Sequence, residues 1–271
     1  MAMNQKLLRP KASGFSPKNI AGLYLWLNGS DSSSVTLNSG NVSEWRDLSG
    51  GGRHFTQATS AAQPVYTTAG QNGKNCLTFD GSRRLLSSSA ASTWAFLHDG
   101  TLRYDVFVVC KTSAASTTLR AILATGSSAR NLRSFFLWHD HRTGQNNSVY
   151  SEVTSIGAGN AGYLAGETIA AQSSGVTRRI RMSGDPANAT VATRLVGHVG
   201  LTDGTSDTAA TGTASAGDPT STLVIGSLNP NSQSFGFSGD ICEIVIFSRA
   251  TNLTTAERAS IDSYLNKKWG L

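Results

Sequence analysis

The stretch Phe235-Gly-Phe-Ser-Gly-Asp-Ile-Cys-Glu-Ile-Val-Ile-Phe247 decides how the rest of this chain is interpreted. Its apolar run follows a glycine-rich turn, which predicts a late, buried β-strand. The residues that follow, 248–271, change to a helical pattern. A buried strand leading into a short helix favours a binding or assembly module over the common enzyme folds.

The C-terminal helix is predicted by its cap and its apolar spacing. Thr254-Thr-Ala-Glu257 matches a capping box, and Asn252 is an alternative cap. Apolar residues recur at roughly helical spacing, with the small Ala256 between them, at Leu253, Ile261 and Leu265. Trp269 follows this stripe, so we expect it to dock the helix onto the strands.

Short apolar segments fill most of the preceding chain, and turn residues separate them. This pattern is typical of an antiparallel β-sandwich. The predicted strands are 20–27, 42–48, 77–81, 105–111, 121–126, 134–141, 148–154, 178–183 and 222–226, followed by 240–247.

Composition excludes several classes of protein. The chain has 271 residues, of which only 15% are charged, and a net charge of +6. The basic residues are scattered and form no stripe with interleaved aromatics, so we expect no nucleic-acid binding. No apolar run is long enough to cross a bilayer, so we expect no membrane insertion.

The cysteines form an odd set, Cys76, Cys110 and Cys242, without CxxC or Cys/His metal spacing. Cys110 and Cys242 lie inside apolar runs. We therefore expect reduced, buried thiols rather than a disulfide framework.

Residues 1–18 predict an extended N-terminal arm, and a disordered terminus is the alternative. The segment is basic, contains no acid, and is broken by Pro10, Gly14 and Pro17. Its apolar side chains would pack on a neighbouring subunit while its cations pair with acids there. The assembly residues are Lys6, Leu7, Leu8, Arg9, Lys11, Phe15 and Lys18. The N-terminus lacks an apolar signal core, which predicts assembly in a host cytoplasm rather than secretion.

Several segments, in order, resemble laminin-G-like, concanavalin-A-type jelly rolls of bacteriophage and bacterial surface proteins. The matching pieces are 22–27, 42–50, 63–66, 77–81, Gly226, 239–247 and 257–271. The resemblance implies an all-β jelly-roll β-sandwich with a short C-terminal helix, spanning residues 19–271.

The resemblance, the basic arm and the missing signal core together suggest a non-enzymatic bacteriophage virion protein. It would be a capsid decoration or tail appendage that binds other virion proteins and forms a homo-oligomer within the particle. The alternative is a carbohydrate-binding adhesin for host-surface polysaccharide. A glycan hydrolase is a second, disfavoured alternative. The resembling family is functionally broad, so fold alone does not settle which of these functions applies.

Aromatic and imidazole side chains suggest one ligand site. Trp138, His139, His141 and Tyr150 could form a sugar platform, with core packing of Trp138 as the alternative. His139 and His141 share a strand face and could meet one metal ion, but no third ligand is evident.

Calcium is the one cofactor that the sequence suggests, and only weakly. Asp203 and Asp207 supply oxygen ligands of the kind that Ca²⁺ uses, but the segment lacks the full loop pattern and a plain turn is the alternative. We therefore predict no cofactor.

Catalytic patterns are missing from the sequence. Glycoside hydrolysis requires two carboxylates, and Glu243 stands alone on its strand beyond Asp240. The run 157–162 matches GxGxxG, but its β-like neighbours favour a glycine-rich turn over a dinucleotide site. No nucleophile elbow occurs. We therefore expect no enzyme activity.

Overall fold

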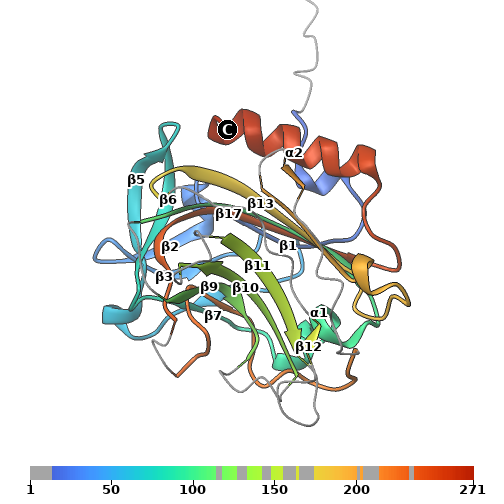
Figure 1. The fold of residues 1–271 in the computed structure, drawn as a ribbon. Coiled ribbons are helices and arrows are strands. Elements are labelled where there is room, and N and C mark those ends of the chain that lie inside the picture. Colours follow the sequence, from blue (N-terminus) through green and yellow to red (C-terminus); the bar gives the residue numbers. More distant parts are fainter. Residues whose placement is uncertain are drawn as a thin grey trace, which may run out of the picture.

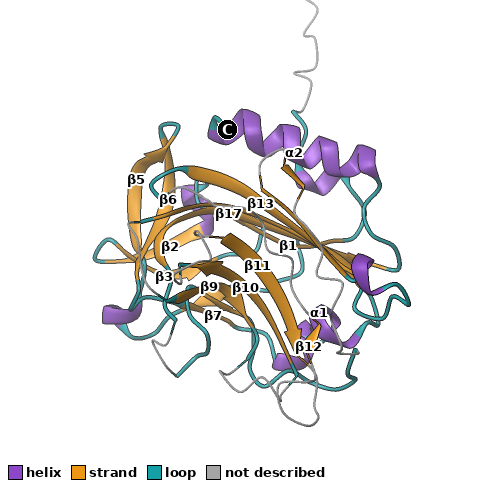
Figure 2. Cartoon of the chain, viewed as in Figure 1, coloured by secondary structure: helices purple, strands orange, loops and turns teal. Residues whose placement is uncertain are grey.

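Antiparallel β-strands in two facing layers make up this chain, with a helix outside one layer (Figures 1 and 2). The computed structural model describes residues 14–113, 118–126, 133–141, 148–154, 163–164, 174–199, 202–203, 214–231 and 235–271. All pairings between its named strands are antiparallel, which confirms the mostly β architecture expected from the sequence.

The first layer is centred on β17 (Ser238–Arg249), which contains the predicted strand 240–247. One edge of β17 pairs with β8 (Arg103–Thr112), and the other pairs with β1 (Leu23–Asn28) and β6 (Lys74–Asp80). The layer continues through strands β13 (Thr177–Gly184), β14 (Leu195–Val199) and β15 (Thr202–Asp203).

The second layer contains shorter strands. Its order is β12 (Tyr163–Leu164), β11 (Ser148–Thr154), β10 (Ser134–Asp140), β9 (Leu119–Ala124), β16 (Val224–Ile225), β7 (Leu85–Ser87), β4 (Phe55–Thr56), β3 (Asn41–Trp45) and β2 (Val35–Asn38). Strand β5 (Val65–Gln71) pairs with both β3 and β6, and thereby joins the two layers at one side.

The main apolar core fills the space between the layers. Alternate residues of β17 and β8 point into it, because successive side chains of a strand face opposite sides. From β17 these are Ile244 and Ile246, and from β8 they are Val106 and Val108, all fully buried. Their neighbours Val245 and Phe107 point the other way and belong to a second cluster.

The second cluster lies between the first layer and α2 (Thr255–Trp269), which crosses its outer face (Figure 1). The predicted capping box is confirmed, because Thr254 and Glu257 exchange side chain to backbone hydrogen bonds. Ile261, Leu265 and Trp269 are buried, as the apolar stripe predicted.

The remaining helical pieces are short. The four-residue α1 is Phe96–Asp99, and single 3₁₀ turns occur at Pro17–Asn19, Ser32–Ser34, Ser60–Ala62, Ala91–Trp94 and Val191–Thr193. No helix in the described part of the chain is long and apolar enough to cross a membrane.

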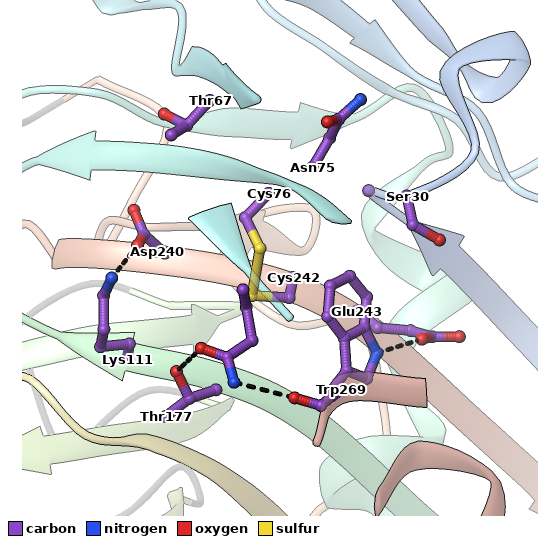
Figure 3. Close-up of a disulfide and its surroundings, with 12 residues drawn as sticks. Ser30, Thr67, Asn75, Cys76, Lys111, Thr177, Asp240, Cys242, Glu243 and Trp269 are labelled. Carbon is purple, nitrogen blue, oxygen red and sulfur yellow. Dashed lines mark hydrogen bonds and ion pairs between the residues drawn. A yellow bond between two sulfur atoms is a disulfide. The ribbon is translucent and has the colours of Figure 1, made fainter. Parts of the chain in front are cut away.

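The expectation of three reduced thiols is wrong for two of them. Cys76 and Cys242 form a disulfide with their Cα atoms 4.3 Å apart (Figure 3). The pairing of Leu77 with Ile241 places the preceding and following cysteines opposite each other on β6 and β17. Sequence spacing could not reveal this register. Cys110 is the free, buried thiol expected, and burial raises its pKa to about 12.

Candidate functional site

The outer face of the first layer, where α2 lies, holds a cluster of buried polar side chains. Its centre is Glu243, which is 1% exposed. One carboxylate oxygen, Oε1, accepts from Trp26 Nε1 at 2.7 Å and from the Tyr264 hydroxyl at 2.8 Å. The other, Oε2, accepts from Trp269 Nε1 at 2.6 Å and from Lys268 Nζ at 2.7 Å.

These contacts explain why a carboxylate is tolerated in an apolar layer. A buried charge is costly unless it is paired and hydrogen-bonded, and both oxygens of Glu243 are satisfied. The arrangement leaves Glu243 occupied with protein donors. Its two oxygens face these donors inside the fold rather than solvent.

Four more ion pairs hold α2 in place. Asp262 pairs with Arg179 and Arg181 of β13, each at 2.9 Å. At the start of the helix, Arg258 pairs with the buried Asp105 at 3.0 Å and Glu257 pairs with Arg249. The contact with Arg249 lowers the pKa of Glu257 to about 2. These ion pairs fix α2 on the first layer, so the helix forms one rigid side of any site next to it.

A groove of about 790 Å³ opens beside this helix. One side is the outer face of α2, and the other consists of the turn between β5 and β6 and the first described residues. The groove is lined by Gly14, Phe15, Asn72, Lys74, Ala259, Ser260, Ser263, Tyr264, Lys267 and Lys268. The volume lies within the range of small-molecule sites, about 300–1,000 Å³.

The groove combines an aromatic surface with cations. Phe15 is 38% exposed and its ring centroid lies 6.0 Å from that of Tyr264. Lys74, Lys267 and Lys268 border these rings, and the lining contains no carboxylate. Such a surface can stack on an apolar ring face, donate hydrogen bonds to hydroxyls, and attract an anionic group.

The turn that forms the far wall is fastened to the helix end. Asn72 Nδ2 donates to the Lys268 carbonyl at 3.1 Å, and Gln71 Nε2 donates to the Trp269 carbonyl at 2.8 Å. The groove is therefore formed before any ligand binds.

Apart from Phe15, none of the groove residues was predicted as a site residue from the sequence. The one available signal was the helical spacing of Tyr264, Lys267 and Lys268, which places them on one face.

The predicted sugar platform on β10 is not an open surface. Trp138 is 5% exposed, stacks on Phe136 at 5.0 Å between ring centroids, and contacts Phe235. His139 and His141 are also buried. Core packing, the alternative kept for Trp138, describes its position. Tyr150 pairs with Trp138 through the backbone of β11.

The two histidines contact each other. His139 Nδ1 lies 2.7 Å from His141 Nε2, a distance that needs one ring nitrogen to donate and the other to accept. Burial, reinforced by the neighbouring imidazole, lowers the pKa of His139 to about 3. Among the described residues, no group of three or more His, Cys, Asp or Glu side chains is arranged to hold a metal ion.

Other predicted site residues fall partly outside the described chain. Asp203 ends the short strand β15, whereas Asp207 and the run 157–162 lie outside the described residues, so the calcium hypothesis stays a prediction. The arm residues Lys6, Leu7, Leu8, Arg9 and Lys11 also lie outside. Phe15 contacts α2, and Lys18 Nζ lies 5.9 Å from the Trp26 ring centroid.

Comparisons with known proteins show the fold alone. No protein-family model and no curated protein sequence matches this chain. Trypanosoma rangeli sialidase in complex with 2,3-difluoro-KDN is similar to it with a TM-score of 0.52 and 12% identity, over 92% of this chain and 33% of the sialidase. The same sialidase with sialic acid gives a TM-score of 0.51 and 13% identity, with the same two shares covered.

A third similar structure is domain 4 of an extracellular arabinanase from Geobacillus stearothermophilus in complex with arabinotriose. Its TM-score is 0.49 at 12% identity, over 87% of this chain and 95% of that domain. This chain spans about a third of the length of the sialidases that it resembles. The similarity to the sialidases shows a shared β fold.

Proposed function

We propose that this chain is a non-enzymatic carbohydrate-binding module of the concanavalin-A-like, laminin-G-like jelly-roll class. The observation that carries the proposal is the groove beside α2, where the Phe15 and Tyr264 rings lie among lysine, asparagine and serine side chains. The fold shared with part of a sialidase supports it, because that neighbour was solved with a sialic acid ligand.

The chemistry of the groove favours an acidic glycan. A sugar ring has one apolar face, which can stack on the exposed ring of Phe15, and hydroxyls that Asn72 and Ser263 can bind. Lys74 and Lys267 add positive charge that no carboxylate in the lining offsets. A carboxylated or sulfated sugar therefore gains more from this groove than a neutral one.

A glycan array that contains neutral, carboxylated and sulfated glycans tests this proposal, followed by titration calorimetry on the best ligand. We expect Phe15→Ala to weaken binding about two- to twelvefold, since aromatic contacts contribute about 0.5–1.5 kcal/mol beyond the area they bury. We expect Lys74→Ala to weaken acidic ligands more than neutral ones. The matched control is Leu102→Ala, which removes a similarly exposed apolar side chain outside the groove.

Absence of binding to every glycan at millimolar concentration would overturn the proposal. If the parent chain binds a glycan specifically and both groove variants bind it with unchanged affinity, the glycan site lies outside this groove. Release of reducing sugar from a bound polysaccharide would contradict the non-enzymatic part of the proposal.

Display on a bacteriophage particle is a second proposal, compatible with the first. It rests on the order of laminin-G-like segments and on the basic, acid-free stretch 1–13, which carries Lys6, Arg9 and Lys11 beside Leu7 and Leu8. In this proposal the module is a capsid decoration or tail appendage, and its partners are other virion proteins and further copies of itself.

A further inference from the structure

Three polar side chains from distant parts of the sequence meet under the end of α2. Lys268 Nζ lies 2.6 Å from Asn28 Oδ1 and 2.7 Å from Glu243 Oε2. The register of β1 against β17 places Asn28 directly opposite Glu243, and the last turn of α2 brings Lys268 over both. Asn28 and Lys268 are 240 positions apart in sequence.

We propose that Lys268 and Asn28 form an intramolecular isopeptide bond, with Glu243 as the proton carrier. The Lys268 amine attacks Cγ of the Asn28 side chain, and the new Nζ–Cγ bond replaces the bond from Cγ to Nδ2. Glu243 takes a proton from Nζ and returns a proton to Nδ2, which leaves as ammonia. Amine and amide therefore give a substituted amide and ammonia, with no oxidant or cofactor.

The Asn28 carbonyl is polarised for this attack. Its Oδ1 accepts from the Ser30 backbone N–H at 3.1 Å and from the Ser30 hydroxyl at 2.8 Å. A backbone N–H can only donate, so this contact identifies the atom as the oxygen rather than the amide nitrogen. Fixed donors on an oxygen that gains negative charge lower the barrier to such a step.

The surroundings bring the Lys268 amine next to a buried proton acceptor. Glu243 and Asn28 are 1% and 8% exposed, and the Lys268 side chain is 13% exposed. Burial lowers the pKa of Lys268, although the ion pair with Glu243 opposes the shift. The indoles of Trp26 and Trp269 donate to Glu243 and restrict access of water to its carboxylate.

Glu243 lies close enough to Lys268 to carry the proton that the reaction between amine and amide must transfer. A general acid–base must lie within hydrogen-bond reach of the proton that it moves, and Glu243 Oε2 meets this condition for Nζ. Holding amine, amide and carboxylate together converts a very slow bimolecular reaction into an intramolecular one. The bond would tie β1 to the C-terminal helix and close almost the whole described fold into one covalent loop.

Intact mass spectrometry of the full chain, after complete disulfide reduction, tests the proposal directly. We expect a mass lower than the sequence mass by one ammonia. Asn28 precedes Gly29, and cyclisation of an Asn-Gly pair also releases ammonia, so a tryptic map is needed. The isopeptide gives a branched peptide that joins residues 19–46 to residues 268–271. A mass equal to the sequence mass would overturn the proposal. An ammonia loss found only in a linear 19–46 peptide would overturn it as well.

Variants assign the roles. Lys268→Arg and Asn28→Ala are expected to lack the branched peptide, whereas the neighbouring Lys267→Arg is expected to retain it. Glu243→Gln keeps the shape of the side chain but cannot accept the proton, so we expect an unlinked chain. A branched peptide in Glu243→Gln would overturn the role of Glu243. The measurement on the parent chain stands even if a variant fails to fold, and it does not depend on glycan binding.

Discussion

Trp269 and Glu243 are joined by a hydrogen bond of 2.6 Å from the indole Nε1 to the carboxylate Oε2, and both side chains are buried (Figure 3). The last helical residue is thereby fastened to the central strand of the first layer. The same indole belongs to the apolar cluster beneath α2. One side chain therefore links the helix to the sheet through both polar and apolar contacts.

We expect Trp269→Ala to lower the free energy of unfolding by about 3–5 kcal/mol, because it leaves a cavity under the helix. Trp269→Phe keeps most of the ring but removes one donor from a buried carboxylate, and we expect a loss of about 1–3 kcal/mol. Urea unfolding measures both. Leu271→Ala, at an exposed neighbouring position, is the control. An unchanged free energy of unfolding in Trp269→Ala would show that the helix docks by other contacts.

The disulfide between Cys76 and Cys242 joins β6 to β17 across a separation of 166 residues. Removing a native disulfide commonly costs about 2–5 kcal/mol, because the unfolded chain regains freedom. We expect reductant to lower the melting temperature of the parent chain. The double variant Cys76→Ala/Cys242→Ala is expected to melt at the reduced temperature, with or without reductant. Equal melting of the oxidised and reduced parent chain would contradict this prediction.

Acidification is expected to destabilise the fold through His139. Its folded pKa is about 3, whereas an unfolded histidine titrates near 6.5. Between these values the unfolded chain binds a proton that the folded chain does not, so stability falls as the pH falls. For this group alone we expect a loss of about 2 kcal/mol between pH 7 and pH 5. Burial also lowers the pKa of His98, which acts in the same direction.

Urea unfolding at pH 7 and pH 5 measures this dependence. In that interval carboxylates with ordinary pKa values remain mostly ionised, so histidines dominate the change. We expect His139→Gln to show a smaller loss of stability than the parent chain. An identical loss in both proteins would contradict this prediction, because it would mean that the pKa of His139 does not differ between the folded and the unfolded chain.

Removing residues 1–13 tests attachment to a particle. The strands, the core and the disulfide lie within residues 14–271, so we expect the truncated chain to keep its melting temperature. The cut preserves Phe15 and Lys18, which contact Tyr264 and Trp26. We expect loss of incorporation into virions, measured by quantifying the protein in purified particles. Normal incorporation would place the attachment surface on the β layers or α2.

The sequence by itself determined the elements with strong local signals. The run around 240–247, the capping box at Thr254 and Glu257, and the apolar stripe of α2 all lie where they were predicted. Their periodicity and capping chemistry act over a few residues. Strands β2, β5 and β7 were missed, because their burial alternates weakly or their runs are short. Strand β14 was missed although its burial alternates, because Gly197 and His198 interrupt its apolar run. Their pairing with neighbouring strands stabilises them.

Only the tertiary structure decided which side chains meet. Cys76 faces Cys242, and Asn28 faces Glu243 beneath Lys268, because strand register and the crossing of α2 bring them together. Trp138 became part of a core rather than a binding surface for the same reason. Local pattern fixes the faces of a strand or helix, whereas packing between distant segments decides which faces are covered and which polar groups share one site.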